Sequence, residues 1–277
     1  MADLAAATTT GPAATRVVDV LATQPHLASY ASTAELASRA GVNVATVVRT
    51  ARQLGFSGWP ALRLEVRSRY LASLSARQVY AEHDAAVATP AIDAIRRDIE
   101  NLETLAATID VEALQAVAAT IDAASKTVVV GSGTFAAPGL QLVHIGTTMG
   151  REMQLERHFG THLANTVARM RPEDCLVTFS LWWLPRQVLE ATEIANERGV
   201  STCVVTDRRM SPLSELADHV VVVPSEGVSS FPSLTPAMAV VHGILAELTR
   251  LGGEDARQGV ERTEAVWARM GLFDLPD

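Results

Sequence analysis

The sequence predicts two domains, an all-α helical bundle followed by a three-layer α/β sandwich with a parallel sheet. Apolar residues recur only at helical spacing up to about residue 124. From Lys126 onward, short valine-rich runs alternate with helical stretches, as they do in α/β domains. At 277 residues the chain is long enough to form two ordinary hydrophobic cores.

The charge is divided unevenly along the chain. Residues 1–80 contain eight arginines and four acidic residues, a net charge of +4. Because the whole chain has a net charge of −8, the remainder carries −12. A basic module followed by an acidic one indicates that the first module meets a polyanion such as DNA.

Composition argues against a membrane or secreted protein. No apolar run reaches the roughly 18 residues that a membrane-spanning helix needs. Residues 1–15 lack the basic start and apolar core of a secretory signal. Cys175 and Cys203 lie in strand-like apolar runs without metal-type spacing, so we expect two buried, reduced thiols in a cytoplasmic protein.

The basic module contains the pattern of a helix-turn-helix. A first helix is expected over residues 16–22, with Pro25 closing it. A capping box at residues 32–35 starts a second helix, which Gly41 ends. Asn43 caps a third helix that runs to about residue 54. Two short helices joined by a tight turn containing glycine are the sequence form of a helix-turn-helix.

The third helix has the composition of a recognition helix. Its apolar side chains recur at helical spacing and are expected in the core: Val47, Val48, Ala51 and Leu54. Polar side chains near such a helix's start reach base edges, and arginine can fork onto guanine or phosphate. The expected DNA contacts are Asn43, Thr46, Arg49, Thr50 and Gln53. On composition alone, a small bundle with solvated polar faces remains the alternative.

Residues 32–64 closely resemble the N-terminal domain of the RpiR family of bacterial regulators. The matching segments follow in order and without gaps: Glu35–Val42, Ala45–Arg49 and Leu54–Trp59. The resemblance implies that residues 43–53 form the recognition helix. It leaves two roles open for three arginines of the following helix, which either contact phosphate or lie on a solvated face: Arg63, Arg67 and Arg69.

The second half predicts a parallel sheet covered by helices on both faces. Strands are expected at Thr127–Val130, Cys175–Ser180, Thr202–Thr206 and His219–Val223, with a weaker candidate near Glu152–Leu155. Helices are expected over residues 111–124, 137–148, 163–170, 186–198, 236–251 and 254–270. We therefore expect a helix-turn-helix domain over 1–80, a linker with an amphipathic helix over 81–110, and an α/β domain over 111–277.

This second domain resembles the SIS (sugar isomerase) domain of RpiR regulators, which has a flavodoxin-like parallel sheet. The matching segments are Val128–Thr134, Arg171–Ser180, Val204–Glu226 and Ser233–Leu245. Together, the two resemblances cover roughly residues 15–270 in the family's domain order. They imply that the α/β domain dimerises and binds a small metabolite at the carboxyl ends of its strands.

The loop that grips phosphate in SIS domains is altered here. That loop typically reads Ser-x-Ser-Gly-x-Thr, whereas residues 180–185 keep only the first serine and replace the others with Trp182, Trp183 and Pro185. In the first loop, Phe135 replaces a common hydroxyl residue. Each lost charge-assisted hydrogen bond costs on the order of 1.5–3 kcal/mol. We therefore expect a ligand other than an ordinary phosphosugar.

An aromatic pocket with a few polar groups is the expected ligand site. Its candidate residues are Ser132, Thr134, Phe135, Ser180, Trp182, Trp183, Arg186 and Glu226. Alternatively, the tryptophans fill a pocket that binds nothing, or they lie in a dimer interface, where tryptophan is enriched.

His158 and His162 lie four residues apart, the spacing that places two metal ligands on one helical face. The intervening residues contain no glutamate of the HExxH type, and two histidines rarely suffice for a metal site. We therefore expect ordinary, partly exposed histidines, with no metal and no cofactor.

These features predict a metabolite-responsive transcriptional regulator that is not an enzyme and has no catalytic residues. We expect it to bind pseudo-palindromic double-stranded DNA as a homodimer or homotetramer. Two alternatives stay open. One is a phosphosugar isomerase with an added N-terminal domain, for which Glu226 is the candidate base. The other is a regulator whose α/β domain only dimerises.

Overall fold

The computed structural model describes residues 11–84, 89–131 and 133–273, which divide into two compact units. The helical unit contains the described residues up to Ile109 together with two return segments, Asp207–Met210 and Pro224–Pro236. The sheet unit contains Asp110–Thr206, Ser211–Val223 and the described residues from Ala237 onward. The domains expected from the sequence are continuous ranges, so that prediction did not include the two return segments.

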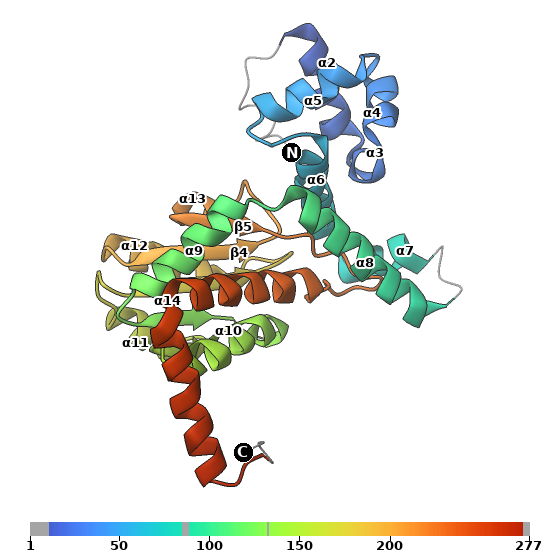
Figure 1. Cartoon of the computed structure of the whole chain (residues 1–277). Coiled ribbons are helices and arrows are strands. Elements are labelled where there is room, and N and C mark those ends of the chain that lie inside the picture. Colours follow the sequence, from blue (N-terminus) through green and yellow to red (C-terminus); the bar gives the residue numbers. More distant parts are fainter. Residues whose placement is uncertain (1–10, 85–88, 132, 274–277) are drawn as a thin grey trace. The chain divides into compact units, whose positions relative to one another are not determined.

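Short helices build the helical unit (Figure 1). They are α2 (Pro12–Thr23), α3 (Pro25–Tyr30), α4 (Thr33–Ala40), α5 (Val44–Gln53), α6 (Trp59–Ser73), α7 (Ala76–Asp84) and α8 (Pro90–Thr108). Apolar side chains from α2 to α6 form one core, and the indole of Trp59 lies within it. The Trp59 Nε1 donates a hydrogen bond of 3.1 Å to the Ala31 carbonyl, so the buried indole is satisfied.

The local signals in the sequence are confirmed in this unit. The Glu35 carboxylate accepts from the Ser32 amide at 2.8 Å, and the Ser32 hydroxyl accepts from the Glu35 amide at 3.2 Å. Gly41 has a φ of 61°, the left-handed value that favours glycine at a helix end. One expectation was wrong: Pro25 begins α3 rather than only closing α2, because proline fits the first turn of a helix.

A five-stranded parallel sheet forms the centre of the sheet unit. Its strands are β1 (Thr127–Val130), β2 (Met153–Glu156), β3 (Cys175–Ser180), β4 (Ser201–Thr206) and β5 (His219–Val222), in the order β2-β1-β3-β4-β5. Every strand pair is parallel. This is the flavodoxin-like order, and it confirms the predicted strands, including the weaker candidate.

Helices cover both faces of the sheet, as predicted. They are α9 (Val111–Ala123), α10 (Ala136–Thr148), α11 (Thr161–Ala168), α12 (Arg186–Glu197), α13 (Pro212–Leu216) and α14 (Thr235–Arg269), with a 3₁₀ turn, η1, at Gly133–Phe135. On β1, Val128 and Val130 share a core with α11 and α12. Val129 faces α10, where a Cβ on Gly139 would lie 3.1 Å from its methyl group. Alternate side chains of one buried strand therefore serve two layers.

Two smaller expectations also agree with the structure. The two C-terminal helices are joined at Gly253, whose φ of 49° and ψ of −118° bend α14. Cys175 and Cys203 are buried and unbridged. Among the described residues, no single helix is long and apolar enough to cross a lipid bilayer; α8 and α9 meet that test only when counted together.

Candidate functional site

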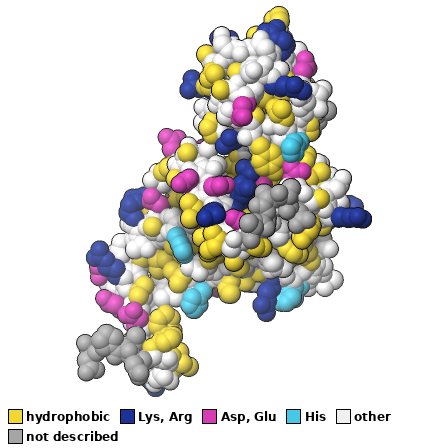
Figure 2. All heavy atoms as spheres, turned by 90° about the vertical axis from the view of Figure 1, so that its right-hand side faces the viewer, with side chains coloured by type: hydrophobic (Ala, Val, Ile, Leu, Met, Phe, Trp, Pro, Cys, Tyr) yellow, Lys and Arg dark blue, Asp and Glu magenta, His cyan; other side chains and the backbone are white. Residues whose placement is uncertain are grey.

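Helix α5 exposes a face that differs from the predicted one. Its exposed residues, including the cap, are Asn43, Val44, Ala45, Arg49, Arg52 and Gln53. In the space-filling view, arginine side chains lie at the surface of the part formed by α2–α5 (Figure 2). Asn43, Arg49 and Gln53 are thus exposed as expected, and Ala45 and Arg52 join them.

The expectation that Thr46 and Thr50 lie on the exposed face of α5 is wrong. Their exposed fractions are 4% and 0%. The Thr46 hydroxyl donates to Asn43 Oδ1 at 3.0 Å, and the Thr50 hydroxyl donates to the Thr46 carbonyl at 2.8 Å. With its hydroxyl hydrogen-bonded within the helix or to its cap, threonine packs in the core almost as valine does.

The arginines of α6 are half-buried and engaged inside the helical unit, so they do not form a solvated face. Arg63 donates to the Ala31 carbonyl at 3.4 Å, and the Arg69 Nε lies 2.7 Å from Glu65. Arg67 pairs with Glu226 of the second return segment. Such pairings depend on which segments fold together, which local sequence does not reveal.

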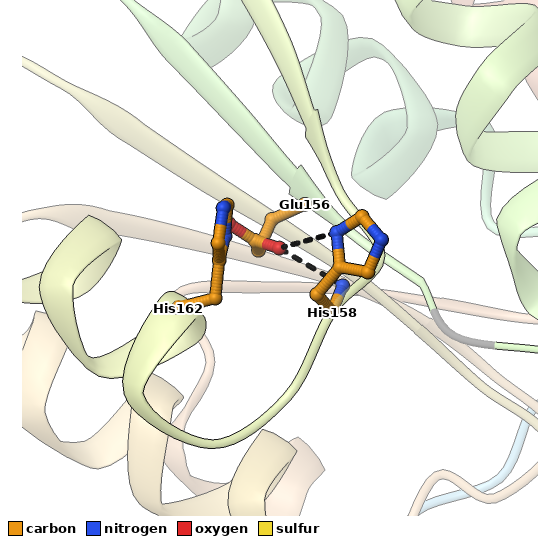
Figure 3. A group of neighbouring side chains, drawn as sticks. All are labelled: Glu156, His158 and His162. Atoms are coloured by element: carbon orange, nitrogen blue, oxygen red, sulfur yellow. Dashed lines mark hydrogen bonds and ion pairs between the residues drawn. The ribbon is translucent and has the colours of Figure 1, made fainter.

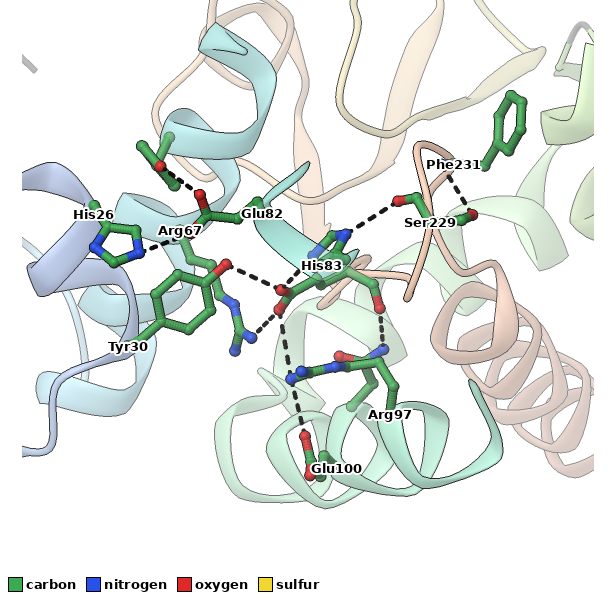
Figure 4. A network of polar contacts seen from close by, with 12 residues as sticks. His26, Tyr30, Arg67, Glu82, His83, Arg97, Glu100, Ser229 and Phe231 are labelled. Carbon is green, nitrogen blue, oxygen red and sulfur yellow. Dashed lines mark hydrogen bonds and ion pairs between the residues drawn. The ribbon is translucent and has the colours of Figure 1, made fainter. Parts of the chain in front are cut away.

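Glu226 is the centre of a polar network whose members Tyr30, Arg67, His83 and Arg97 are labelled in Figure 4. Its side chain is 4% exposed and forms an ion pair with Arg67 on α6. One carboxylate oxygen accepts from the Tyr30 hydroxyl at 3.2 Å and lies 3.0 Å from His83 Nε2. The other oxygen lies 3.7 Å from the guanidinium of Arg97 on α8. We call this group the Glu226 network.

The network keeps the carboxylate ionised. Burial by itself raises the pKa of Glu226, but the hydrogen bond from His83 and the charges of Arg67 and Arg97 hold it below its usual value. His83 Nδ1 also lies 3.2 Å from the Ser229 carbonyl. Because both ring nitrogens face acceptor oxygens, both bonds can form together only when the ring carries two protons.

The first return segment is bound to the same helix, α6. The buried carboxylate of Glu65 accepts from the Arg209 amide at 2.6 Å, and Arg69 donates to the Met210 carbonyl at 2.6 Å. The Ser225 hydroxyl donates to Asp207 at 2.9 Å, which links the two return segments. In the chain, these segments follow β4 and β5 directly.

The carboxyl ends of β1 and β3 meet at the switch point of the strand order, where parallel sheets bind ligands. After β1, a Cβ on Gly131 would collide with the Phe135 carbonyl, so the turn requires glycine. Thr134 is exposed and Phe135 is half-buried in η1. The expected ligand residue Ser132 lies outside the described residues.

After β3, the altered loop adopts a strained turn. Trp182 has a φ of 60°, a costly value for a bulky residue, and its side chain is only 1% exposed. Trp183 is 47% exposed and meets it edge to face with ring centroids 5.9 Å apart. The Ser180 hydroxyl donates to the Trp183 carbonyl at 3.2 Å. Trp183 is therefore the tryptophan whose ring reaches solvent.

Two further ligand candidates belong to other elements than this loop. Arg186, at the start of α12, is highly exposed and pairs with Glu190 at 2.7 Å. Glu226 belongs to the helical unit, whereas the other described candidates belong to the sheet unit.

A second buried carboxylate, missed as a site by sequence reasoning, lies at the end of β2 (Figure 3). Glu156 accepts from the His158 amide at 2.9 Å and the Thr166 hydroxyl at 2.9 Å, and it lies 2.8 Å from His162 Nδ1. Burial raises the pKa of Glu156, but these hydrogen bonds outweigh it and leave the pKa below its ordinary value. We call this group the Glu156 cluster. The two-residue spacing from Glu156 to His158 was its only sequence signal.

Comparisons with known proteins agree with both halves of this architecture. The model of the helix-turn-helix domain of the rpiR family matches residues 8–73, and the SIS domain model matches residues 121–246. The sugar isomerase domain of the RpiR transcription factor from Sphaerobacter thermophilus is 32% identical, with a TM-score of 0.61, and the match covers 63% of this chain and 97% of that one. The chain belongs to the RpiR family.

Other relatives extend the likeness to the rest of this RpiR-family chain. The Vibrio vulnificus NanR protein, solved in complex with ManNAc-6P, has the same fold over 96% of both chains, with a TM-score of 0.61 and 20% identity. The uncharacterized HTH-type transcriptional regulator YfhH of Escherichia coli is 43% identical over 58 residues, 21% of this chain. That match spans about a fifth of the length of YfhH.

Proposed function

We propose that this RpiR-family chain is a transcriptional regulator that binds double-stranded DNA through α5. The observation that carries the proposal is a capped, partly exposed helix in a helix-turn-helix, with Arg49 and Arg52 on its exposed face. Arginine and asparagine read guanine and adenine edges, and a small apolar group such as Ala45 can contact a thymine methyl. Asn43, Arg49, Arg52 and Gln53 are the proposed polar contacts.

Selection of fragments from the protein's own genome, followed by sequencing of the retained DNA, tests this proposal. We expect a pseudo-palindromic site, and Arg49→Ala should weaken binding to it by about 1–3 kcal/mol. Arg257→Ala, which removes an equally charged and exposed arginine from α14, should leave affinity unchanged. Retention of only salt-sensitive, sequence-independent DNA would overturn the proposal.

The protein is proposed to act in the cytoplasm as a symmetric homodimer or homotetramer, presenting two recognition helices to the two half-sites. Light scattering on the purified protein, free and with operator, tests the assembly. A monomer bound to a single half-site would contradict it.

The regulator is proposed to sense a metabolite at the carboxyl edge of the sheet. The effect of metabolite binding is proposed to reach α5 through the return segments. Each return segment follows a strand of the sheet and is bound to α6, which is next to α5 in the chain. A ligand that moved either segment would therefore bias the helical unit between two arrangements. Unchanged operator affinity at saturating metabolite would exclude this route.

The metabolite is proposed to be something other than an ordinary phosphosugar. NanR was solved with a phosphosugar, whereas Trp182, Trp183 and Pro185 stand in this chain where the SIS loop usually supplies hydroxyl and glycine residues. Thermal-shift screening with matched phosphorylated and unphosphorylated sugars tests the difference. Micromolar binding of a hexosamine phosphate would refute it, and no response to any metabolite would favour a domain that only dimerises.

Isomerase activity is the alternative, and the Glu226 network argues against it. A carboxylate held ionised by Arg67, His83 and Arg97 is a weak base, and its charge is already paired. We therefore propose that the chain is not an enzyme. Turnover of an aldose phosphate to the ketose phosphate, lost in Glu226→Gln, would refute this.

A further inference from the structure

The Glu156 cluster gathers three groups that bind metals. One ligand atom from each of Glu156, His158 and His162 lies within 4.8 Å of the others. The imidazole rings are tilted by 60° to each other, with centroids 5.3 Å apart (Figure 3). A metal ion about 2.0–2.2 Å from each ligand atom requires these atoms to converge, and the exposed rings would rotate inward to complete the site.

The fold brings these groups together over a short stretch of chain. Glu156 is the last residue of β2, and His162 is the second residue of α11. Between them, Gly160 has a φ of 72°, which lets the chain reverse, and its amide donates to Gln187 at 2.7 Å. The turn that unites strand and helix is therefore itself held in place by α12.

The chemistry of the donors selects the class of metal. Two imidazoles and one carboxylate suit borderline divalent ions such as Zn²⁺, Co²⁺ and Ni²⁺, whereas Mg²⁺ and Ca²⁺ prefer oxygen ligands. The carboxylate is buried, while the side chains of His158 and His162 are 62% and 63% exposed. An ion here would keep coordination positions open to water or to another ligand, as ions at non-structural sites do.

The surroundings support the ligands. The Thr166 hydroxyl donates to Glu156 at 2.9 Å and orients the carboxylate, as groups behind metal ligands commonly do. The Glu156 carbonyl accepts from the Gly131 amide at 3.1 Å, so the cluster adjoins the loop that follows β1. It therefore lies at the carboxyl edge of the sheet.

We propose that Glu156, His158 and His162 bind one divalent transition-metal ion of the zinc class in each chain. Sequence spacing alone did not support a metal site, because Glu156 precedes the histidines instead of standing between them. The Glu156 carboxylate, buried beneath both rings, supplies the third ligand. Metal binding here requires neither the DNA contacts nor the metabolite of the proposed function.

Titration of untagged, chelator-treated protein with Co²⁺ tests the site. Protein-bound Co²⁺ gives a visible absorption band, and we expect saturation at one ion per chain and displacement by Zn²⁺. His158→Gln and His162→Gln should each weaken binding at least tenfold. The matched control is His144→Gln, which removes an exposed histidine of α10 and should change affinity less than twofold.

Thermal melting supplies a second readout. Zn²⁺ should raise the melting temperature of the wild type and of His144→Gln, but not that of the double variant His158→Gln/His162→Gln. Both replaced rings are exposed, so the double variant should fold, and far-ultraviolet circular dichroism checks this. Absence of saturable binding, or equal binding by the wild type and the double variant, would overturn the proposal and leave two histidines that only hydrogen-bond to a carboxylate.

Discussion

Glu226 and Glu156 are both almost fully buried, and both have lowered pKa values, but their partners differ. Glu226 is bound by Tyr30, Arg67, His83 and Arg97, which come from four different helices. The side chains around Glu156 lie within ten residues of it in the chain. One carboxylate joins distant segments, whereas the other organises a local turn.

The two sites also differ in what covers them. Of the residues around Glu226, Arg67, His83 and Arg97 are partly or largely buried, and the two arginines carry permanent positive charge. The Glu156 carboxylate is covered by two imidazoles whose side chains are exposed to solvent. A buried carboxylate with fixed cations is suited to holding a fold together, and one beneath exposed imidazoles is suited to binding.

The largest effect should follow from removing the fixed cation at Glu226. Arg67→Met leaves a buried carboxylate without its main partner, so we expect the helical unit to lose about 3–5 kcal/mol of unfolding free energy. Urea denaturation measures this. Arg96→Met is the matched control on α8, where the arginine is exposed, and should cost less than about 1 kcal/mol. Equal losses in both variants would show that the Glu226 network does not hold the unit together.

A smaller loss is expected at the local site. In Glu156→Gln, the amide oxygen can still accept from one donor, but the amide NH₂ group faces the others. We therefore expect the free energy of unfolding to fall by about 1–3 kcal/mol. Urea denaturation of the wild type and of Glu156→Gln measures this, with unfolding monitored by the fluorescence of the tryptophans in the sheet unit. A loss as large as that of Arg67→Met would remove the distinction between the tertiary and the local carboxylate.

Lowering the pH should remove part of the stabilisation that Glu226 gives to the folded state. Because its folded pKa is lowered, the stabilisation is complete above the unfolded value near 4.3 and is lost as pH falls through the folded pKa. Each unit of lowering corresponds to about 1.4 kcal/mol. The difference in stability between the wild type and Glu226→Gln should therefore shrink as pH falls below about 4.3. A difference that stayed constant on acidification to pH 2 would contradict the ionised network.

The smallest effect is expected when one exposed ring is removed in the absence of metal. His162→Gln should change unfolding free energy by less than about 1 kcal/mol, because solvent screens an ion pair with an exposed partner. Thermal melting in chelator checks this against His144→Gln. A loss of several kcal/mol would assign the ring a structural role and weaken the case for an open site.

The helix-turn-helix and the strands could be predicted because their signals are local. The capping box at Ser32, the cap at Asn43 and the valine-rich strands each act within a few residues. The faces of α5 were harder to predict, because threonine belongs to either face until its hydroxyl finds a partner within the helix. The Thr46 hydroxyl bonds the Asn43 side chain and the Thr50 hydroxyl bonds the Thr46 carbonyl, which moved the candidate DNA contacts toward Ala45 and Arg52.

By itself, the sequence determined the order of elements, the family resemblance, the parallel sheet and the altered loop after β3. Only the tertiary structure decided that Arg67 pairs with Glu226 and that Glu156 lies beneath two histidines. Periodicity and capping are short-range effects, readable along the chain. The pairing of charges 159 positions apart depends on which segments the fold brings together. Burial then strengthens the electrostatic interaction between the two charges, because it removes water from around them.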